Sequence, residues 1–130
     1  MHRSRIGVVL IDHPEESAAA ATTFWSGVLG GPSVSAQGPS EEDPYLELPS
    51  LPGGVGLEVQ RTGSGTAPRV HLDIETDDVP AEVARVVALG AEVLEDRTGY
   101  AILRDPGGLV FCVVPVQREQ EFAEQAVTWE

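Results

Sequence analysis

The side chains best suited to chemistry lie on the polar faces of segments that alternate between polar and apolar residues. In residues 69–76, His71, Asp73 and Glu75 alternate with apolar residues, which predicts a strand with one polar face. The apolar positions of this segment are Val70, Leu72 and Ile74. We expect them to face a helix, so that His71, Asp73 and Glu75 face a ligand cleft. A neutral imidazole there could bind zinc, nickel or iron, or could hydrogen-bond to Asp73 or to water.

Two other alternating segments carry candidate ligand-binding residues. In residues 56–61, Glu58 and Gln60 share the face opposite the apolar residues, so both are expected to face the cleft. Tyr45 has the same parity in the strand predicted at residues 45–48. Tyr100 is placed at the mouth of the cleft, with a purely structural role at a hairpin edge as the alternative.

Cys112 is the only cysteine, which excludes an intrachain disulfide and a cysteine-rich zinc module. A thiolate can bind zinc, but a lone cysteine between Phe111 and Val113 is more often a small, inert apolar residue. The default location for such a chain is the reducing cytoplasm.

The first half of the chain predicts a strand, a helix and three strands. Residues 5–11 form a β-branched run, and Ser17 and its acidic neighbours begin a helix that Gly30 ends. Apolar residues recur at helical spacing along it, which predicts its buried stripe: Ala21, Phe24, Trp25, Val28 and Leu29. Core packing is favoured for Trp25 over a place in a pocket. Strands are predicted at residues 33–36, 45–48 and 56–61.

The second half repeats this order after a linker at residues 62–67. The strand at 69–76 is followed by a helix that Asp78 caps, with Pro80 in its first turn and Gly90 at its end. Three more strands are predicted at residues 91–94, 101–103 and 109–114. The repeat predicts an α+β fold of two tandem βαβββ modules.

Four stretches resemble the vicinal oxygen chelate superfamily, and most of all its small glyoxalase-like domains. They are TFWSGVLGG at 23–31, VHLDI at 70–74, VVALGA at 86–91 and DPGGLVF at 105–111. The superfamily also contains glyoxalase I, bleomycin-resistance proteins and extradiol dioxygenases. The resemblance covers about residues 5–115 and implies one domain over residues 1–130. It contains modules at about 4–61 and 68–116 around a concave cleft, and a tail at 117–130.

The resemblance also implies where a metal would bind. Enzymatic members carry one ligand in the first and last strand of each module. His71 occupies one such position and Glu58 another, or Gln60 if the register slides by two residues. Cys112 stands where the usual ligand is Glu, and residues 5–10 offer no good ligand. A complete site for zinc, nickel, iron or manganese is therefore not expected.

Three functions follow from this resemblance. The first is a protein that binds a small organic ligand in an acidic cleft without a metal. The second is a metal-dependent lyase, isomerase or dioxygenase that uses His71 and Glu58. The third is a resistance protein of the bleomycin type that sequesters a cationic drug.

Charge narrows the set of partners. The chain has 8 Lys and Arg against 21 Asp and Glu, a formal net charge of −13 at pH 7. Phosphate backbones would be repelled, so nucleic acid is a poor partner, and a neutral or cationic small molecule is favoured. No apolar run approaches the roughly 18 residues that span a bilayer, and no signal peptide or membrane contact is expected.

The tail at 117–130 lies outside the repeat. Phe122, Ala126 and Trp129 recur at amphipathic spacing, so the tail is expected to dock on its own sheet or on a second subunit. Because sheet edges and aromatic surface would otherwise be exposed, we expect a homodimer.

Overall fold

The computed structural model describes residues 1–31 and 38–130 of the chain. Within these residues it has three helices and eight strands, and the predicted α+β class is confirmed. The strand expected at residues 33–36 lies outside the described residues. No helix in the described part is both long enough and apolar enough to span a bilayer.

The described chain forms two compact units. Unit 1 comprises residues 1–8 and 71–130, and unit 2 comprises residues 9–70. Strands β1 (His2–Pro14) and β4 (Arg69–Thr76) contribute residues to both units. The units therefore differ from the sequence modules, because β1 is not confined to one of them.

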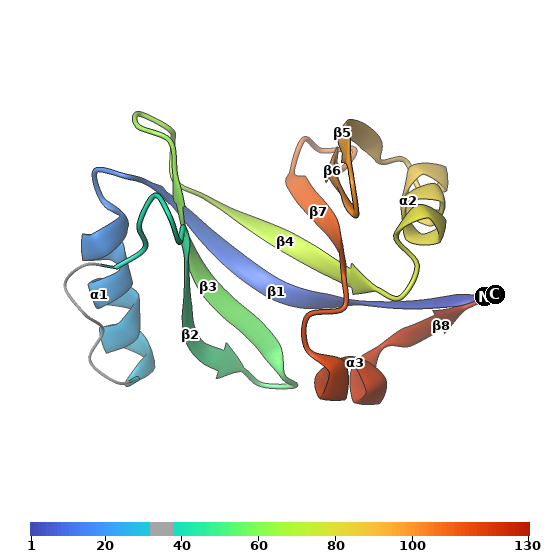
Figure 1. Ribbon diagram of the computed structural model, residues 1–130, viewed down its shortest axis with the longest axis horizontal. Helices are drawn as coiled ribbons and strands as arrows, with labels where there is room; N and C mark the ends of the chain where they lie inside the picture. Colours follow the sequence, from blue (N-terminus) through green and yellow to red (C-terminus); the bar gives the residue numbers. More distant parts are fainter. Residues whose placement is uncertain (32–37) are drawn as a thin grey trace. The chain divides into compact units, whose positions relative to one another are not determined.

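Unit 2 is built on an antiparallel hairpin of β2 (Tyr45–Leu51) and β3 (Val55–Thr62). Strand β3 lies between β2 and the C-terminal part of β1, and helix α1 (Ala18–Leu29) packs on β2 and β3 (Figure 1). The inward side chains of the hairpin form the core with residues of β1 and α1. Its members are Leu48, Leu57 and Val59, with Val9, Ile11, Trp25, Leu29, Leu46 and Leu51 packed against them.

Helix α1 does not bury the stripe predicted for it. Phe24 and Val28 are 61% and 58% exposed, whereas the small residues Ala18, Thr22 and Ser26 are buried. Thr22 can be buried because its hydroxyl donates to the carbonyl of Ala18 at 2.8 Å. Trp25 and Leu29 do pack on the core, so the core role favoured for Trp25 agrees with its contacts.

In unit 1, helix α2 (Val79–Ala88) is followed by three strands, which are β5 (Glu92–Arg97), β6 (Tyr100–Arg104) and β7 (Val110–Pro115). With β4 they form a sheet in the order β4–β7–β6–β5, and the N-terminal part of β1 lies beside β4. Strands β4 and β7 are parallel, while β7, β6 and β5 are antiparallel. The core of the unit is Val86, Ala101, Leu103, Phe111 and Val113, with Leu72, Ile74, Val79, Val83 and Ala91 packed against it.

Helix α2 (Val79–Ala88) begins and ends where the sequence predicts. The side chain of Asp78 accepts a hydrogen bond from the backbone N–H of Ala81 at 3.0 Å, and Pro80 lies in the first turn. After the helix, Gly90 adopts φ +117°, a conformation that favours glycine. The helix packs on β6 and β7 (Figure 1).

The tail folds back onto unit 1. Helix α3 (Glu119–Gln125) buries Phe122, and β8 (Val127–Trp129) pairs with residues 2–4 of β1. The indole N–H of Trp129 donates to the Ser4 hydroxyl at 2.8 Å. This pairing is the reason that β1 begins at His2 rather than at the predicted residue 5. The predicted amphipathic spacing does not continue as one helix, because the chain becomes extended at Ala126.

Candidate functional site

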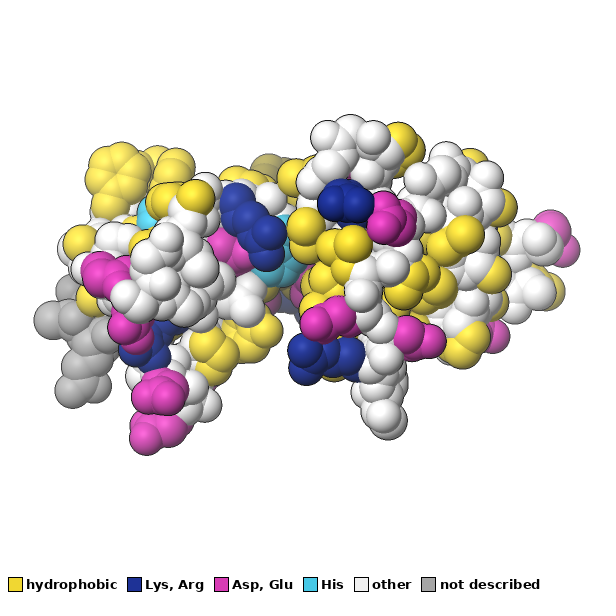
Figure 2. Space-filling view, turned by 90° about the horizontal axis from the view of Figure 1, so that it is seen from above, with side chains coloured by type: hydrophobic (Ala, Val, Ile, Leu, Met, Phe, Trp, Pro, Cys, Tyr) yellow, Lys and Arg dark blue, Asp and Glu magenta, His cyan; other side chains and the backbone are white. Residues whose placement is uncertain are grey.

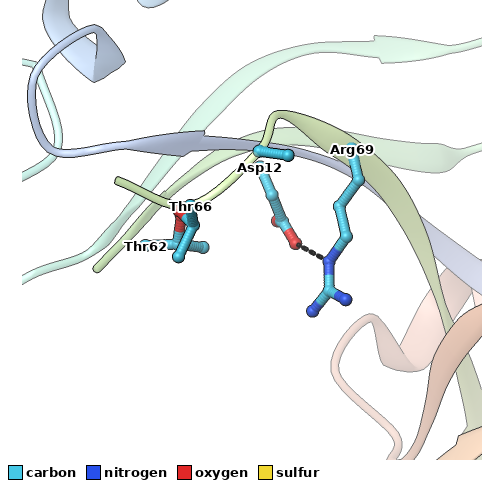
Figure 3. Close-up of a pocket in the computed structure, with 5 residues that line it drawn as sticks. Asp12, Thr62, Thr66 and Arg69 are labelled. Atoms are coloured by element: carbon cyan, nitrogen blue, oxygen red, sulfur yellow. Dashed lines mark hydrogen bonds and ion pairs between the residues drawn. The ribbon is translucent and has the colours of Figure 1, made fainter. Parts of the chain in front are cut away.

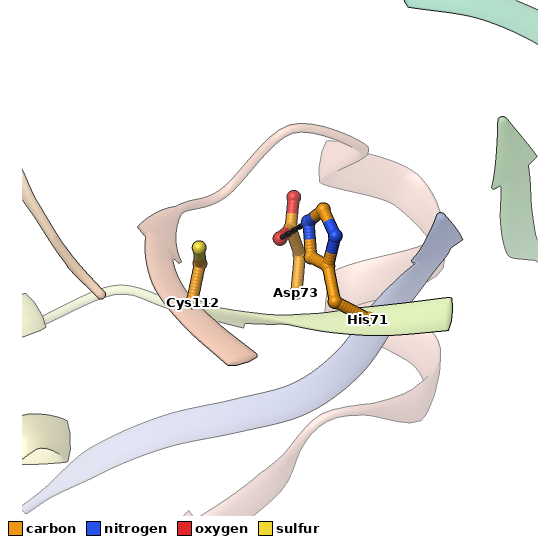
Figure 4. A group of neighbouring side chains, drawn as sticks. All are labelled: His71, Asp73 and Cys112. Atoms are coloured by element: carbon orange, nitrogen blue, oxygen red, sulfur yellow. Dashed lines mark ion pairs between the residues drawn. The ribbon is translucent and has the colours of Figure 1, made fainter. Parts of the chain in front are cut away.

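The polar face of β4 meets Cys112 of β7 in unit 1. The parallel register pairs Asp73 with Cys112, so both side chains lie on the same face of the sheet. His71 and Asp73 are 3.6 Å apart, measured from Nε2 to Oδ1. One ligand atom from each of His71, Asp73 and Cys112 lies within 4.8 Å of the other two (Figure 4). We call these three residues the donor group.

The two faces of β4 follow the parity predicted for this strand. Leu72 and Ile74 pack against the core of unit 1, and His71 is only 7% exposed on the other face. In β7, Phe111 and Val113 belong to the core, which leaves Cys112 on the face of the donor group. The thiol is therefore not one of the core side chains.

One prediction on this strand is wrong. Val70 is 48% exposed and does not join the apolar face, because it lies one residue from the start of β4, before that face is covered.

Glu75 shares the polar face of β4 but does not face an open cleft. Its side chain is fully buried, and Arg5 donates from Nε to Oε2 at 3.2 Å. Gly7 provides the room, since a Cβ built on it would lie only 2.4 Å from the Glu75 carboxyl carbon. The polar face is thus closed at Glu75 by an ion pair, and a buried pair of this kind serves structure rather than ligand binding.

Tyr100 joins the face of the donor group through β6. The β6–β7 register pairs Ile102 with Cys112, so Tyr100, two residues before Ile102, has the same orientation. Both residues are half-buried. The face therefore combines the three side chains of the donor group with an aromatic and an aliphatic side chain.

The other predicted residues lie on unit 2. Tyr45 is paired with Gln60 across the β2–β3 hairpin, and the Gln60 amide donates to the Tyr45 hydroxyl at 3.2 Å. Glu58 is paired with Glu47 on the same face, opposite the buried core residues. Tyr45, Glu58 and Gln60 thus share one polar face, as their parity predicts.

The donor group has the chemistry of a borderline-metal site. Zinc in proteins takes imidazole, thiolate and carboxylate ligands, and three protein ligands leave a position for water or substrate. The 3.6 Å separation of His71 Nε2 and Asp73 Oδ1 is near what two ligands of one ion require, and the ligand atom of Cys112 lies within 4.8 Å of the other two. The residues present fit such an ion.

Comparison with known proteins identifies the family. The sequence model described as "Glyoxalase-like domain" matches residues 8–114. The chain belongs to this family. It is therefore a member of the vicinal oxygen chelate superfamily, and the resemblance seen in the sequence is confirmed.

A solved structure shows the fold of this glyoxalase-like domain independently. It is titled as an NAD-dependent benzaldehyde dehydrogenase from Legionella pneumophila, and it matches with a TM-score of 0.59. At 11% identity the match covers 85% of this chain and 98% of that chain, so it shows the fold alone. No curated protein matches the chain.

The sequence indicates His71 and Glu58 as the metal candidates, and it gives Asp73 and Cys112 only as members of the wider ligand-binding set, without predicting that they are neighbours. Their proximity comes from the parallel register of β4 and β7, which no local pattern encodes. The sequence contains only a weak signal for this proximity, which is that both residues lie between apolar neighbours in strands of the same predicted module.

Proposed function

We propose that this glyoxalase-like protein binds a small organic molecule at the face of unit 1 that carries the donor group. The observation that supports this most strongly is the convergence of an imidazole, a carboxylate and a thiol within 4.8 Å. A few converging polar groups beside apolar side chains are typical of small-molecule sites, and here Tyr100 and Ile102 supply the apolar part.

At the donor group, charge favours a neutral or cationic ligand. The net charge of −13 repels anions at long range, and Asp73 offers an acceptor for a positively charged or hydrogen-bonding group. The His71 imidazole can donate or accept, depending on its tautomer. A ligand with an amine or hydroxyl beside a small apolar body would use all of these contacts.

A thermal-shift screen of neutral and cationic metabolites and antibiotics, run on protein treated with chelator, tests this proposal. We expect at least one saturable ligand whose affinity falls about tenfold or more in Asp73→Asn, because a hydrogen bond to a charged group is lost. Asp96→Asn removes an exposed carboxylate of β5 and is the matched control. A cationic antibiotic among the ligands would favour the drug-sequestering function.

The donor group also favours a second candidate, a metal-dependent lyase, isomerase or dioxygenase. A bound divalent ion would act as a Lewis acid toward substrate oxygens, held by His71, Asp73 and Cys112. Metal analysis after purification without chelator separates the two candidates. Stoichiometric metal that Cys112→Ser and Asp73→Asn both reduce, with Asp96→Asn unchanged, would establish the second. Metal below one-tenth equivalent, with ligand binding retained, would establish the first.

A further inference from the structure

A pocket in unit 2 shares no residue with the donor group. It has a volume of about 340 Å³, within the range of small-molecule sites. It lies where β1 and β3 end and β4 begins (Figure 3). Its lining residues are Asp12, Thr62, Thr66, Ala67 and Arg69. We call it the Arg69 pocket.

Arg69 is held in place by only one edge of its guanidinium group. Its Nε donates to Oδ2 of Asp12 at 3.3 Å, and the Asp12 side chain is only 2% exposed. Nη1 and Nη2 make no hydrogen bond or ion pair with the residues that the structure describes, and Figure 3 shows them directed away from Asp12. Asp12 therefore orients a guanidinium group whose two terminal nitrogens can bind a ligand.

Other arginines use a terminal nitrogen for a carboxylate. Nη2 of Arg61, Arg97 and Arg104 lies 2.6, 2.7 and 2.6 Å from Glu15, Glu95 and Glu92, respectively. On the face drawn in Figure 2, basic side chains accordingly have acidic side chains beside them. In these three pairs a terminal nitrogen meets the carboxylate, whereas the contact of Arg69 with Asp12, like that of Arg5 with Glu75, is made by Nε, the inner edge of the fork.

The opposite wall of the pocket offers acceptors. The Thr66 hydroxyl donates to the carbonyl of Gly63 at 2.8 Å, so the 2.6 Å bond between the hydroxyls of Thr62 and Thr66 must take its proton from Thr62. Both hydroxyl protons are then used, and the oxygens retain lone pairs. This wall can accept a hydrogen bond from a ligand, whereas Arg69 can only donate.

The loop that carries this wall is anchored. The Glu16 carboxylate, just before α1, accepts from the Ser64 hydroxyl and from the Gly65 N–H, the latter at 3.4 Å. The Ser64 hydrogen bond holds the pKa of Glu16 below its ordinary value. The positions of Thr62 and Thr66 are therefore supported from a second segment.

We propose that the Arg69 pocket binds a small carboxylate that also carries a hydroxyl or amino group. The carboxylate accepts from the terminal nitrogens of Arg69, and the second group donates to the hydroxyl oxygens of Thr62 and Thr66. Fork-shaped donors suit planar carboxylates, and the methyl groups of the threonines and Ala67 contact the carbon chain. This site is additional to the one under Proposed function and does not depend on it.

The test is an NMR titration of the ¹⁵N-labelled protein with 3-hydroxybutyrate. We expect saturable shifts of the amides of residues 62–69, with an affinity in the millimolar range. Butyrate lacks the hydroxyl and butane-1,3-diol lacks the carboxylate, so each should bind about fivefold or more weakly than 3-hydroxybutyrate. Absence of saturable shifts at residues 62–69, or butyrate binding as tightly as 3-hydroxybutyrate, would overturn the proposal.

Two variants test the two walls separately. Arg69→Lys keeps a positive charge beside Asp12 but lacks the fork, and should weaken 3-hydroxybutyrate about tenfold. Thr62→Val should reduce 3-hydroxybutyrate to the affinity of butyrate. Arg97→Lys, in an exposed ion pair of unit 1, is the matched control and should bind normally. Unchanged affinity in Arg69→Lys would rule the site out, whereas His71→Ala, which tests the proposed function, should leave this titration unaltered.

Discussion

Glu82 of α2 has no solvent exposure, and the N-terminal segment of β1 contacts it through His2. His2 lies 3.1 Å from Oε2, and Arg85 donates from Nε to Oε1 at 2.7 Å. Burial raises the pKa of Glu82, but hydrogen bonds from Arg85, Ser4 and His2 outweigh it and lower the pKa below the ordinary 4.5. Glu82 therefore stabilises the fold when it is ionised.

We expect Glu82→Gln to lower the free energy of unfolding by about 1–3 kcal/mol at pH 7, since hydrogen bonds to a charged group are lost. A depressed folded pKa contributes stability above the unfolded pKa, and that contribution disappears as the pH falls through the folded value. The deficit of the variant should thus shrink below about pH 4. Urea denaturation at pH 7 and pH 3.5 measures this change.

The exposed pair of Glu95 with Arg97 provides the control, because Glu95→Gln should change stability by less than about 0.5 kcal/mol. A Glu82→Gln deficit that is independent of pH would show that shape, rather than charge, is what the position requires.

Among the elements, α1 shows most clearly where sequence patterns are sufficient and where they are not. The two-residue period of β4 correctly separates His71 and Asp73 from Leu72 and Ile74, because a strand has only two faces. A helix can turn any face inward, and α1 buries Thr22 although its hydrophobic pattern favours Phe24. The partners Asp73 with Cys112, and Asp12 with Arg69, depend on strand register, which local patterns do not contain.

The neighbouring aromatic residues of α1 should differ sharply in their effect on stability. Trp25 packs on the unit 2 core, whereas Phe24 is mainly solvated and meets Trp25 only edge-on, with ring centroids 5.2 Å apart. Trp25→Ala should cost about 2–4 kcal/mol and Phe24→Ala about 1 kcal/mol or less. Urea denaturation of both variants measures the difference, and equal costs would contradict the burial of this helix.

At the other helix end, α2 depends on a side-chain cap. Asp78→Ala should lower the free energy of unfolding by about 1 kcal/mol, since it removes the acceptor for the Ala81 N–H. Asp96→Ala removes an exposed carboxylate from β5 and should have little effect. If both variants lose equal stability, the loss reflects general charge rather than the cap.

For the whole molecule, the homodimer expected from the sequence stays a prediction. The structure supports fewer of the reasons given for it. The aromatic surface of the tail is covered by the chain itself, and the outer strand of unit 1, β5, carries four charged residues that discourage strand pairing. Light scattering at tens of micromolar should give the mass of a dimer if the predicted association occurs, and a monomer mass would contradict it.

Truncation after Val116 tests what the tail contributes. Phe122 is buried, Arg85 lies 3.8 Å from the ring centre of Trp129, and β8 pairs with β1. The two aromatic side chains represent several kcal/mol of gross burial, from which the entropy of ordering 117–130 must be subtracted. A net loss of about 1–3 kcal/mol should lower Tm by roughly 5–10 °C and leave the fold intact. Truncation after Gln125 removes β8 but keeps Phe122. Its Tm should therefore fall between that of the full chain and that of the chain truncated after Val116. Because the tail docks on its own chain, neither truncation should change the number of chains in the assembly, as measured by light scattering. A dimer that dissociates on truncation would show that the tail also contacts the second subunit.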